Sequence, residues 1–458
     1  MKKKIIKMLG AALLAVIVAF SSSCSQQKDY GEEYNYETDC QYSYYSNVGI
    51  WKVVQSDGKG QYVFRNNYIY YYNTKEKTLT PLCNKPNCLH DMETDKERLD
   101  DCNAYAPTAK IGTNYFIQYY DGYVYYFSAS NNDDNVTNSL YRVKNDGSKK
   151  DKIFTTNDEM PVITWLLHRG YLYYATQTYS YGGNETYTKC MLKSVELSSN
   201  MSEKNAKVIF ESDEEHDVLS LSQLKAYKNY LCYSLTANQK GSETTTTESW
   251  FKQLYLPMYI YNIETGENRE IPVPEGYSDT TFIGRVMFLK DKMLVSLADN
   301  AADMKNDMYN LEYKLPIYSM NYDLTDQKIW LDGVEQGKWV QTYDDYVIIS
   351  DAYIQFYPYV YPDKVSNSDL LPDQSELCTN VEIYSSDAKR ISYFIYPMNE
   401  QGSFSGFGPD GVNVAAESND DSWSVYELRF EDVLNCKGEE VELEKVSTRK
   451  YGPLRGLY

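Results

Sequence analysis

The chain has 458 residues, with 45 Lys and Arg against 65 Asp and Glu, which gives a formal net charge of −20 at pH 7. A surface of that sign repels the phosphates of nucleic acids and the headgroups of anionic lipids, so no nucleic-acid partner is expected. Length alone does not require several domains, because one repeat array can absorb a chain of this size.

The N-terminus has the layout of an export signal. A basic start is followed by an apolar core at residues 9–20 and then by Ser21-Ser22-Ser23-Cys24. The core is too short to span a membrane and is typical of a secretory signal peptide. Small residues before a cysteine are similar to a bacterial lipobox, although Ser21 stands where an apolar residue is usual. We expect a signal peptide over residues 1–23 and lipidation of Cys24; an ordinary cleaved signal peptide is the alternative.

The segment after Cys24 is polar. Residues 25–37 show no apolar period, which predicts a tether over residues 24–39 between a lipid anchor and the folded body. No second long apolar run follows, so no further membrane segment is expected. The predicted location is extracytoplasmic, at the outer face of the cell membrane, with the lipid as the membrane contact.

A repeated phrase dominates residues 40–458. A polar turn precedes a short strand rich in tyrosine and aliphatic residues about every 50–60 residues. Clear copies occupy 67–72, 121–127, 169–174 and 228–233, and weaker copies occupy 291–295, 345–349 and 410–414. A second apolar strand and turn follow in most units, for example 140–143 before 145–147. Seven units of four antiparallel strands predict an all-β fold, a β-propeller of seven four-stranded blades.

Extra residues fall between the second and third strands of several units, at 239–249, 300–307 and 361–376. Long loops on one face of a repeat array often carry binding function. The tyrosines of the repeated phrase are expected to pack between sheets. Loop aromatics outside the phrase are the better candidates for ligand contact: Tyr353, Phe356, Tyr357, Tyr359 and Tyr361.

Cysteine and histidine gather in one short segment, the insertion at 82–104 between the first two units. It contains Cys83, Cys88, His90 and Cys102. Three thiols and an imidazole are enough for a closed tetrahedral zinc site, although Cys-x4-Cys is looser than the usual two-residue spacing. Disulfides in an oxidising exterior, or reduced packing cysteines, are the alternatives. A metal or a disulfide would be structural here, because a closed ligand set leaves no open position for catalysis.

These motifs resemble those of a family of uncharacterised lipoproteins from Gram-positive anaerobes, with DUF5050 and TolB-like propeller repeats. The resemblance rests on Leu82-Cys83-x-Lys85-Pro86-x-Cys88-x-His90, on Cys102-x-Ala104 and on blades such as 121–147, and it covers roughly residues 60–235. It implies a propeller fold and a surface location. It supplies no substrate, so no catalytic residue is transferred.

No catalytic motif is found in the sequence. Gly402-Ser403-Phe404-Ser405-Gly406 places Phe404 at the nucleophile position of a hydrolase elbow. His168 is expected to be a packing residue and His216 a solvated one. The acidic loop 131–135 is read as a solvated turn rather than a calcium site. We therefore predict a binding or scaffolding module for a glycan, a peptide or an envelope protein. The alternative is a carbohydrate-active enzyme with paired carboxylates facing the central channel.

Overall fold

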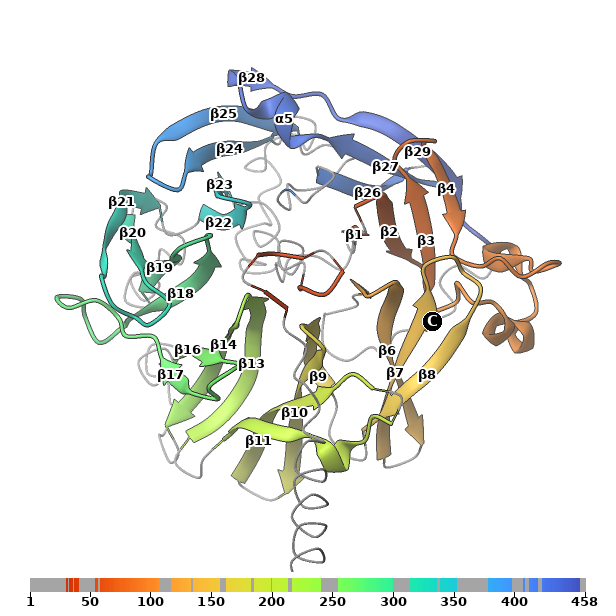
Figure 1. Ribbon diagram of the computed structural model, residues 1–458, viewed down its shortest axis with the longest axis horizontal. Helices are drawn as coiled ribbons and strands as arrows, with labels where there is room; N and C mark the ends of the chain where they lie inside the picture. The colour runs from red at the N-terminus through yellow and green to blue at the C-terminus, as the bar shows by residue number, and fades with distance from the viewer. Residues whose placement is uncertain are drawn as a thin grey trace, which may run out of the picture. The chain divides into compact units, whose positions relative to one another are not determined.

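Seven β-sheets follow one another along the chain and lie around a common centre (Figure 1). They come from a computed structural model. It describes residues 30–31, 33–35, 37–40, 54–56, 58–107, 117–132, 135–156, 162–182, 185–198, 200–212, 216–239, 254–299, 314–335, 338–351, 378–397, 407, 412–418 and 422–453. All seven sheets belong to one compact unit, Tyr34–Tyr458. The predicted signal peptide and Cys24 lie outside the described residues.

The sheets are numbered here in chain order. Sheets 1 and 2 contain β1 (Val54–Ser56), β2 (Gly60–Arg65), β3 (Tyr68–Asn73) and β4 (Thr78–Pro81), then β5 (Gln118–Tyr120), β6 (Tyr123–Asn132), β7 (Asn135–Lys144) and β8 (Lys150–Thr155). Sheets 3 and 4 contain β9 (Val162–His168), β10 (Tyr171–Gly182), β11 (Glu185–Glu196) and β12 (Lys207–Glu211), then β13 (His216–Tyr227), β14 (Tyr230–Gln239), β15 (Leu254–Tyr255), β16 (Met258–Asn262) and β17 (Asn268–Glu270).

Sheets 5 to 7 complete the ring. Sheet 5 contains β18 (Thr281–Phe288), β19 (Met293–Asp299), β20 (Lys314–Met320) and β21 (Lys328–Glu335). Sheet 6 contains β22 (Lys338–Tyr343), β23 (Tyr346–Asp351), β24 (Cys378–Ser385), β25 (Arg390–Pro397) and β28 (Lys437–Glu440). Sheet 7 contains β26 (Val412–Ser418), β27 (Ser422–Leu428) and β29 (Glu444–Lys450). Helix in the described ranges is limited to α5 (Phe430–Val433) and three short 3₁₀ turns, η2 (His90–Met92), η3 (Lys96–Asp101) and η4 (Glu203–Asn205).

The all-β propeller prediction is confirmed, but the expected seven complete blades are not all present. Six of the described sheets have four or more strands, and sheet 7 has three. The difference arises in the segment after β27, which passes through α5 and places β28 parallel to β25 of sheet 6. This strand therefore extends the sixth blade instead of completing the seventh.

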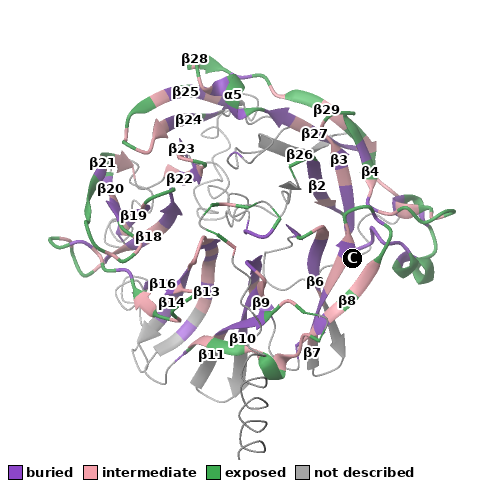
Figure 2. Cartoon of the chain, in the orientation of Figure 1, coloured by how far each residue is buried: buried purple, intermediate pink, exposed green. Residues whose placement is uncertain are grey.

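Aromatic rings fill the space between neighbouring sheets, as expected for the tyrosines of the repeated phrase. The rings of Tyr62 and Tyr119 join sheets 1 and 2, with centroids 5.7 Å apart and nearly parallel planes. Tyr70 meets Trp423 of sheet 7 edge-on, with centroids 5.0 Å apart. Buried residues line the packed faces of the sheets, and exposed residues lie mainly on turns and outer strands (Figure 2).

Short turns connect many of the described strands, while the three predicted insertions, apart from Gln239, lie outside the described residues. The flanking strands place those insertions between the second and third strands of sheets 4, 5 and 6, as expected. In the described part of the chain, no helix is long and apolar enough to cross a membrane.

Residues 37–40, called the docked segment below, pack onto the turns that precede the second strands of sheets 2 and 3. Asp121 and Arg169 donate backbone N–H groups to the carbonyls of Glu37 and Thr38, at 2.6 and 2.7 Å. Thr38 and Asp39 are buried. The end of the predicted tether is therefore part of the folded body.

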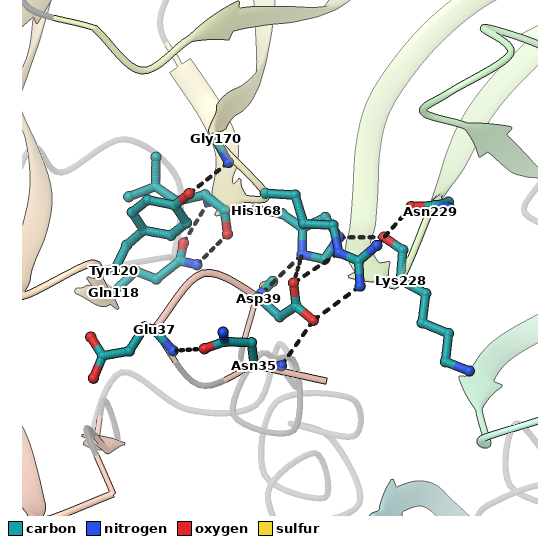
Figure 3. Close-up of polar contacts among 12 residues, drawn as sticks. Asn35, Glu37, Asp39, Gln118, Tyr120, His168, Gly170, Lys228 and Asn229 are labelled. Atoms are coloured by element: carbon teal, nitrogen blue, oxygen red, sulfur yellow. Dashed lines mark hydrogen bonds and ion pairs between the residues drawn. The ribbon is translucent and has the colours of Figure 1, made fainter. Parts of the chain in front are cut away.

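The docked segment is held by buried polar groups (Figure 3). Arg169 donates from Nε to the Asp39 carboxylate at 2.9 Å and from Nη1 to Asn229 at 2.7 Å, which links sheets 3 and 4. His168 Nδ1 accepts the N–H of Cys40 at 3.0 Å, so its Nε2 carries the proton and donates to the Lys228 carbonyl at 2.6 Å. Burial lowers the pKa of His168 to about 4, although the negative charge of Asp39 opposes that shift. His168 is thus a neutral packing residue, as expected.

Candidate metal centre

The structure brings Cys83, Cys88, His90 and Cys102 together; these four residues are called the Cys/His cluster. One ligand atom from each lies within 4.8 Å of those of the other three. The Cys102 sulfur and the His90 Nδ1 are 3.7 Å apart. Three of the residues are half-buried and Cys102 is buried. The insertion therefore folds around a compact set of one nitrogen and three sulfur donors.

Local turns of the chain produce this convergence. Cys83 lies two residues after the end of β4, and Cys88 closes a turn by donating its N–H to the Lys85 carbonyl at 3.4 Å. Asn87 precedes it with a φ of +65°. Cys102 caps η3 by donating to Leu99 at 3.0 Å. His90 has a φ of +53°, a conformation that is uncommon outside glycine and is concentrated at functional positions.

The turn between β7 and β8 of sheet 2 packs against the loop that contains Cys83, called the Cys83 loop below. Gly147, with a φ of +70°, lies so close that a Cβ there would be 2.8 Å from the Cys83 nitrogen. Its carbonyl accepts hydrogen bonds from the Asn84 N–H at 3.2 Å and the Asn103 side chain at 2.8 Å. Glycine is required here because any side chain would push this loop away.

The electrostatics of the cluster favour one thiolate. Burial raises the pKa of Cys83, but N–H donation from Lys85 and Asn103 and contacts with the other two thiols outweigh it, so the pKa is lowered overall. Burial, followed by the charge of Cys83, raises the pKa of Cys102. Burial lowers the pKa of His90, which keeps the imidazole neutral and able to bind a metal.

Two lysines border the cluster. Lys150 Nζ donates to the carbonyls of Asp100, Cys102 and Tyr105 at 3.1, 2.8 and 3.1 Å. Lys85 Nζ donates to the Asp101 carbonyl at 2.5 Å. Three thiolates around a divalent cation would carry one net negative charge, and these ammonium groups are placed to offset it.

The disulfide alternative is not realised in the structure. Every cysteine whose side chain is described is a free thiol: Cys40, Cys83, Cys88, Cys102, Cys190, Cys232 and Cys436. The donor set fits zinc, because thiolate and imidazole are its usual protein ligands and four of them close its coordination.

The residue after His90 connects the cluster to the last sheet. The buried Asp91 carboxylate accepts two hydrogen bonds from Arg449 of β29, both at 2.6 Å, and a third from Tyr70 at 3.0 Å. A Cβ on Gly452 would lie 1.6 Å from the Asp91 carbonyl oxygen, so only glycine fits at this contact. We call Asp91, Arg449, Tyr70 and Gly452 the closing network. It was not predicted, because its partners lie at opposite ends of the chain.

The other predicted site residues cannot be placed. Cys24 and the loop aromatics Tyr353, Phe356, Tyr357, Tyr359 and Tyr361 lie outside the described residues. A pocket lined by Glu427, Asp432, Glu442 and Glu444 occurs around β27, α5 and the segment between β28 and β29. None of these is the first strand of its sheet, so this pocket is not the axial site that the enzyme alternative requires.

Comparison with known proteins gives no family. No family model matches the sequence, and no curated protein matches it. A chain from a structural study of two prolyl endopeptidases matches with a TM-score of 0.47 and 9% identity, over 91% of this chain and 50% of that one. Prolyl oligopeptidase B from Galerina marginata matches with a TM-score of 0.44 and 10% identity, over 90% and 53%. Dipeptidyl peptidase 4 from Porphyromonas gingivalis matches with a TM-score of 0.40 and 10% identity, over 88% and 54%. The chain thus spans about half the length of these structures, and the propeller assignment rests on the sheet topology.

Proposed function

We propose that this protein is an extracytoplasmic β-propeller that binds or scaffolds a glycan, a peptide or an envelope protein, and that its Cys/His cluster holds a structural zinc ion. The convergence of four zinc-type donor atoms within 4.8 Å carries the metal proposal. The propeller fold supports the binding proposal, because such rings present loops around a rigid frame. The export-type N-terminus supports anchoring at the outer face of the cell membrane through Cys24.

The zinc would act on structure rather than on chemistry. Four protein donors leave no position for a substrate or a water molecule, which is the pattern of structural sites. Zinc would hold the two ends of the insertion, the Cys83 loop and the end of η3, against each other. It would also fix His90 and, through it, the position of Asp91.

Elemental analysis tests the metal assignment. Residues 25–458, purified under reducing conditions, should contain one zinc per chain, and Cys88→Ser should lower that content severalfold. Cys436→Ser is the matched control, because Cys436 is a free, half-buried thiol outside the cluster. Protein without zinc whose three cluster thiols react freely with an alkylating agent would contradict the assignment.

A binding screen tests the proposed function. The same protein should capture a defined glycan or an envelope protein from an array and release it unchanged. Shortened glycan products in that screen would instead establish the enzyme alternative.

A further inference from the structure

The inner strands of three neighbouring sheets place two cationic side chains near each other, and one of them lies over a tryptophan ring. The first strands of sheets 4, 5 and 6, β13, β18 and β22, lie toward the middle of the ring (Figure 1). Lys225 extends from β13 to the first strand of the next sheet and donates to the Val286 carbonyl at 3.1 Å. Arg285 likewise extends from β18 to the first strand of the next sheet, where its guanidinium lies 3.6 Å from the ring centroid of Trp339 of β22.

Irregular backbone positions both cations. The pairing of β13 with β14 shifts between Ser222 and Lys225, and the pairing of β18 with β19 shifts between Ile283 and Arg285. Gln223, inside the first shift, has a φ of +51°. Bulges of this kind redirect side chains and are frequent beside functional sites. A glutamine in the left-handed region is uncommon and indicates backbone strain.

The fold does not require a charge at either position. Arg285 pairs with Ser296, the fourth residue of β19, and the fourth residue of β23, Ile349, pairs with Val340. Lys225 pairs with Cys232, the third residue of β14, and the third residues of β19 and β23, Val295 and Ile348, pair with Val286 and Gln341. Neutral side chains therefore serve at the equivalent positions of neighbouring sheets.

Arg285 has no carboxylate partner among the described residues, although the chain has 65 acids. Other arginines do form such pairs: Arg98, Arg142, Arg169, Arg269, Arg390, Arg429 and Arg449. Burial lowers the pKa of Arg285 to about 10, and burial together with the charge of Arg285 lowers the pKa of Lys225 to about 8. Two partly desolvated cations thus repel each other with no counter-charge from the described residues, so an added anion would stabilise both.

We propose that Arg285, Trp339 and Lys225 form a binding site for a carboxylate-bearing ligand at the inner edge of sheets 4 to 6. A guanidinium can donate two parallel hydrogen bonds to a carboxylate, and stacking on Trp339 fixes the plane of that fork. Lys225 adds a second positive charge from the neighbouring sheet. The proposal deepens the binding function above by naming the ligand class, and it rests on that function.

Titration calorimetry on residues 25–458 tests the site, with sodium glucuronate, sodium succinate, inorganic phosphate and glucose as probes. Glucuronate should bind, glucose should not, and Arg285→Gln should weaken glucuronate binding about tenfold or more. Lys225→Met, which removes the charge but keeps a long side chain, should weaken it less. Arg269→Gln, on the outer strand β17, is the control and should change nothing. Succinate bound as tightly as glucuronate would identify a small-carboxylate site rather than an acidic-sugar site, and both results support the proposal.

Three results would overturn the proposal: no binding of either carboxylate at tens of millimolar, preference for phosphate, or full affinity in both Arg285→Gln and Lys225→Met. Lys225→Met keeps the test decisive if Arg285→Gln fails to fold. The two proposals can fail separately. If Arg285→Gln still bound a neutral partner with full affinity, the binding-module proposal would be supported and the carboxylate site at Arg285 would be rejected. If glucuronate or succinate bound at Arg285 but the screen found no glycan or protein partner, this site would stand and the binding-module proposal would fail.

Discussion

Two buried carboxylates each hold an arginine from a distant part of the chain. Asp39 pairs with Arg169, and Asp91 pairs with Arg449 through two 2.6 Å hydrogen bonds. Removing one member of a buried pair leaves the other charge desolvated and unpaired, which costs far more than loss of an exposed pair. At the residue scale, these two ion pairs fix the docked segment and the insertion between β4 and β5, which hydrophobic burial alone does not fix.

Arg449→Met should lower the free energy of unfolding by about 3 kcal/mol, because it leaves Asp91 buried without its cation. Urea denaturation measures the change. Arg390→Met is the control, since Arg390 and Glu382 are 51% and 32% exposed, and it should cost at most about 0.5 kcal/mol. A similar loss in both variants would refute a special role for the closing network.

His168 should make the protein sensitive to acid. Its pKa falls from 6.5 to about 4 on folding, so the folded state binds fewer protons than the unfolded state between those values. Stability should therefore be intact above pH 6.5 and decrease by about 3 kcal/mol as the pH falls to 4. His168→Gln should flatten this part of a plot of unfolding free energy against pH. An unchanged slope in the variant would assign the acid sensitivity to other groups.

At the scale of elements, the insertion between β4 and β5 is coupled to the last strand. His90 and Asp91 are adjacent, so any metal held by the Cys/His cluster also fixes the carboxylate that binds Arg449 of β29. The insertion therefore joins the first and seventh sheets as well as stabilising itself.

If the Cys/His cluster holds the proposed zinc, its chelation should loosen two segments that are far apart in sequence. Amide hydrogen exchange should speed up about tenfold or more at residues 83–102 and at β29, because both lose the fixed position of His90. The hairpin β10–β11 on sheet 3 should keep its protection and serves as the internal reference. Faster exchange at residues 83–102 with an unchanged β29 would show that the cluster and the closing network are independent.

The sequence predicted the features that depend on local pattern. Tyrosine-rich strands after polar turns marked the repeats, and cysteine spacing marked the four members of the cluster. The docked segment was missed because it contains few apolar residues and is held by backbone hydrogen bonds and by Asp39. Strand β28, with the sequence Lys-Gly-Glu-Glu, shows no alternation and could not be assigned to sheet 6. The bulges at Lys225 and Arg285 leave no signature because they depend on how two strands align.

At the scale of the whole molecule, the ring closes through side chains and not through strand exchange among the described residues. Strands β1 to β4 of sheet 1 all come from one stretch of chain, and β26, β27 and β29 of sheet 7 come from another. Trp423 against Tyr70 and Arg449 against Asp91 join them. The docked segment, near the start of the folded body, is hydrogen-bonded to sheets 2 and 3.

The proposed anchor predicts where the protein is found. Cys24→Ala should move it from the membrane fraction to the medium or leave it unprocessed, because the lipid would have no attachment point. Fractionation followed by immunoblotting measures the distribution. Normal processing with unchanged membrane retention would remove the lipoprotein proposal.

Side-chain closure has a consequence for the order of events during synthesis. The first sheet is complete at residue 81, whereas Trp423 and Arg449 are made several hundred residues later. At typical rates of about 5–20 residues per second, this delay is tens of seconds. During this delay the sheets already made form an incomplete ring, and Tyr70 of the first sheet has no Trp423 ring to pack against. Residues 83–102 are already present, so the proposed metal could bind the insertion and hold Asp91 in place before Arg449 exists. Asp91 would then be in position to bind Arg449 when the last strand is made. Until Trp423 is made, the Tyr70 ring is an uncovered aromatic surface to which a chaperone could bind.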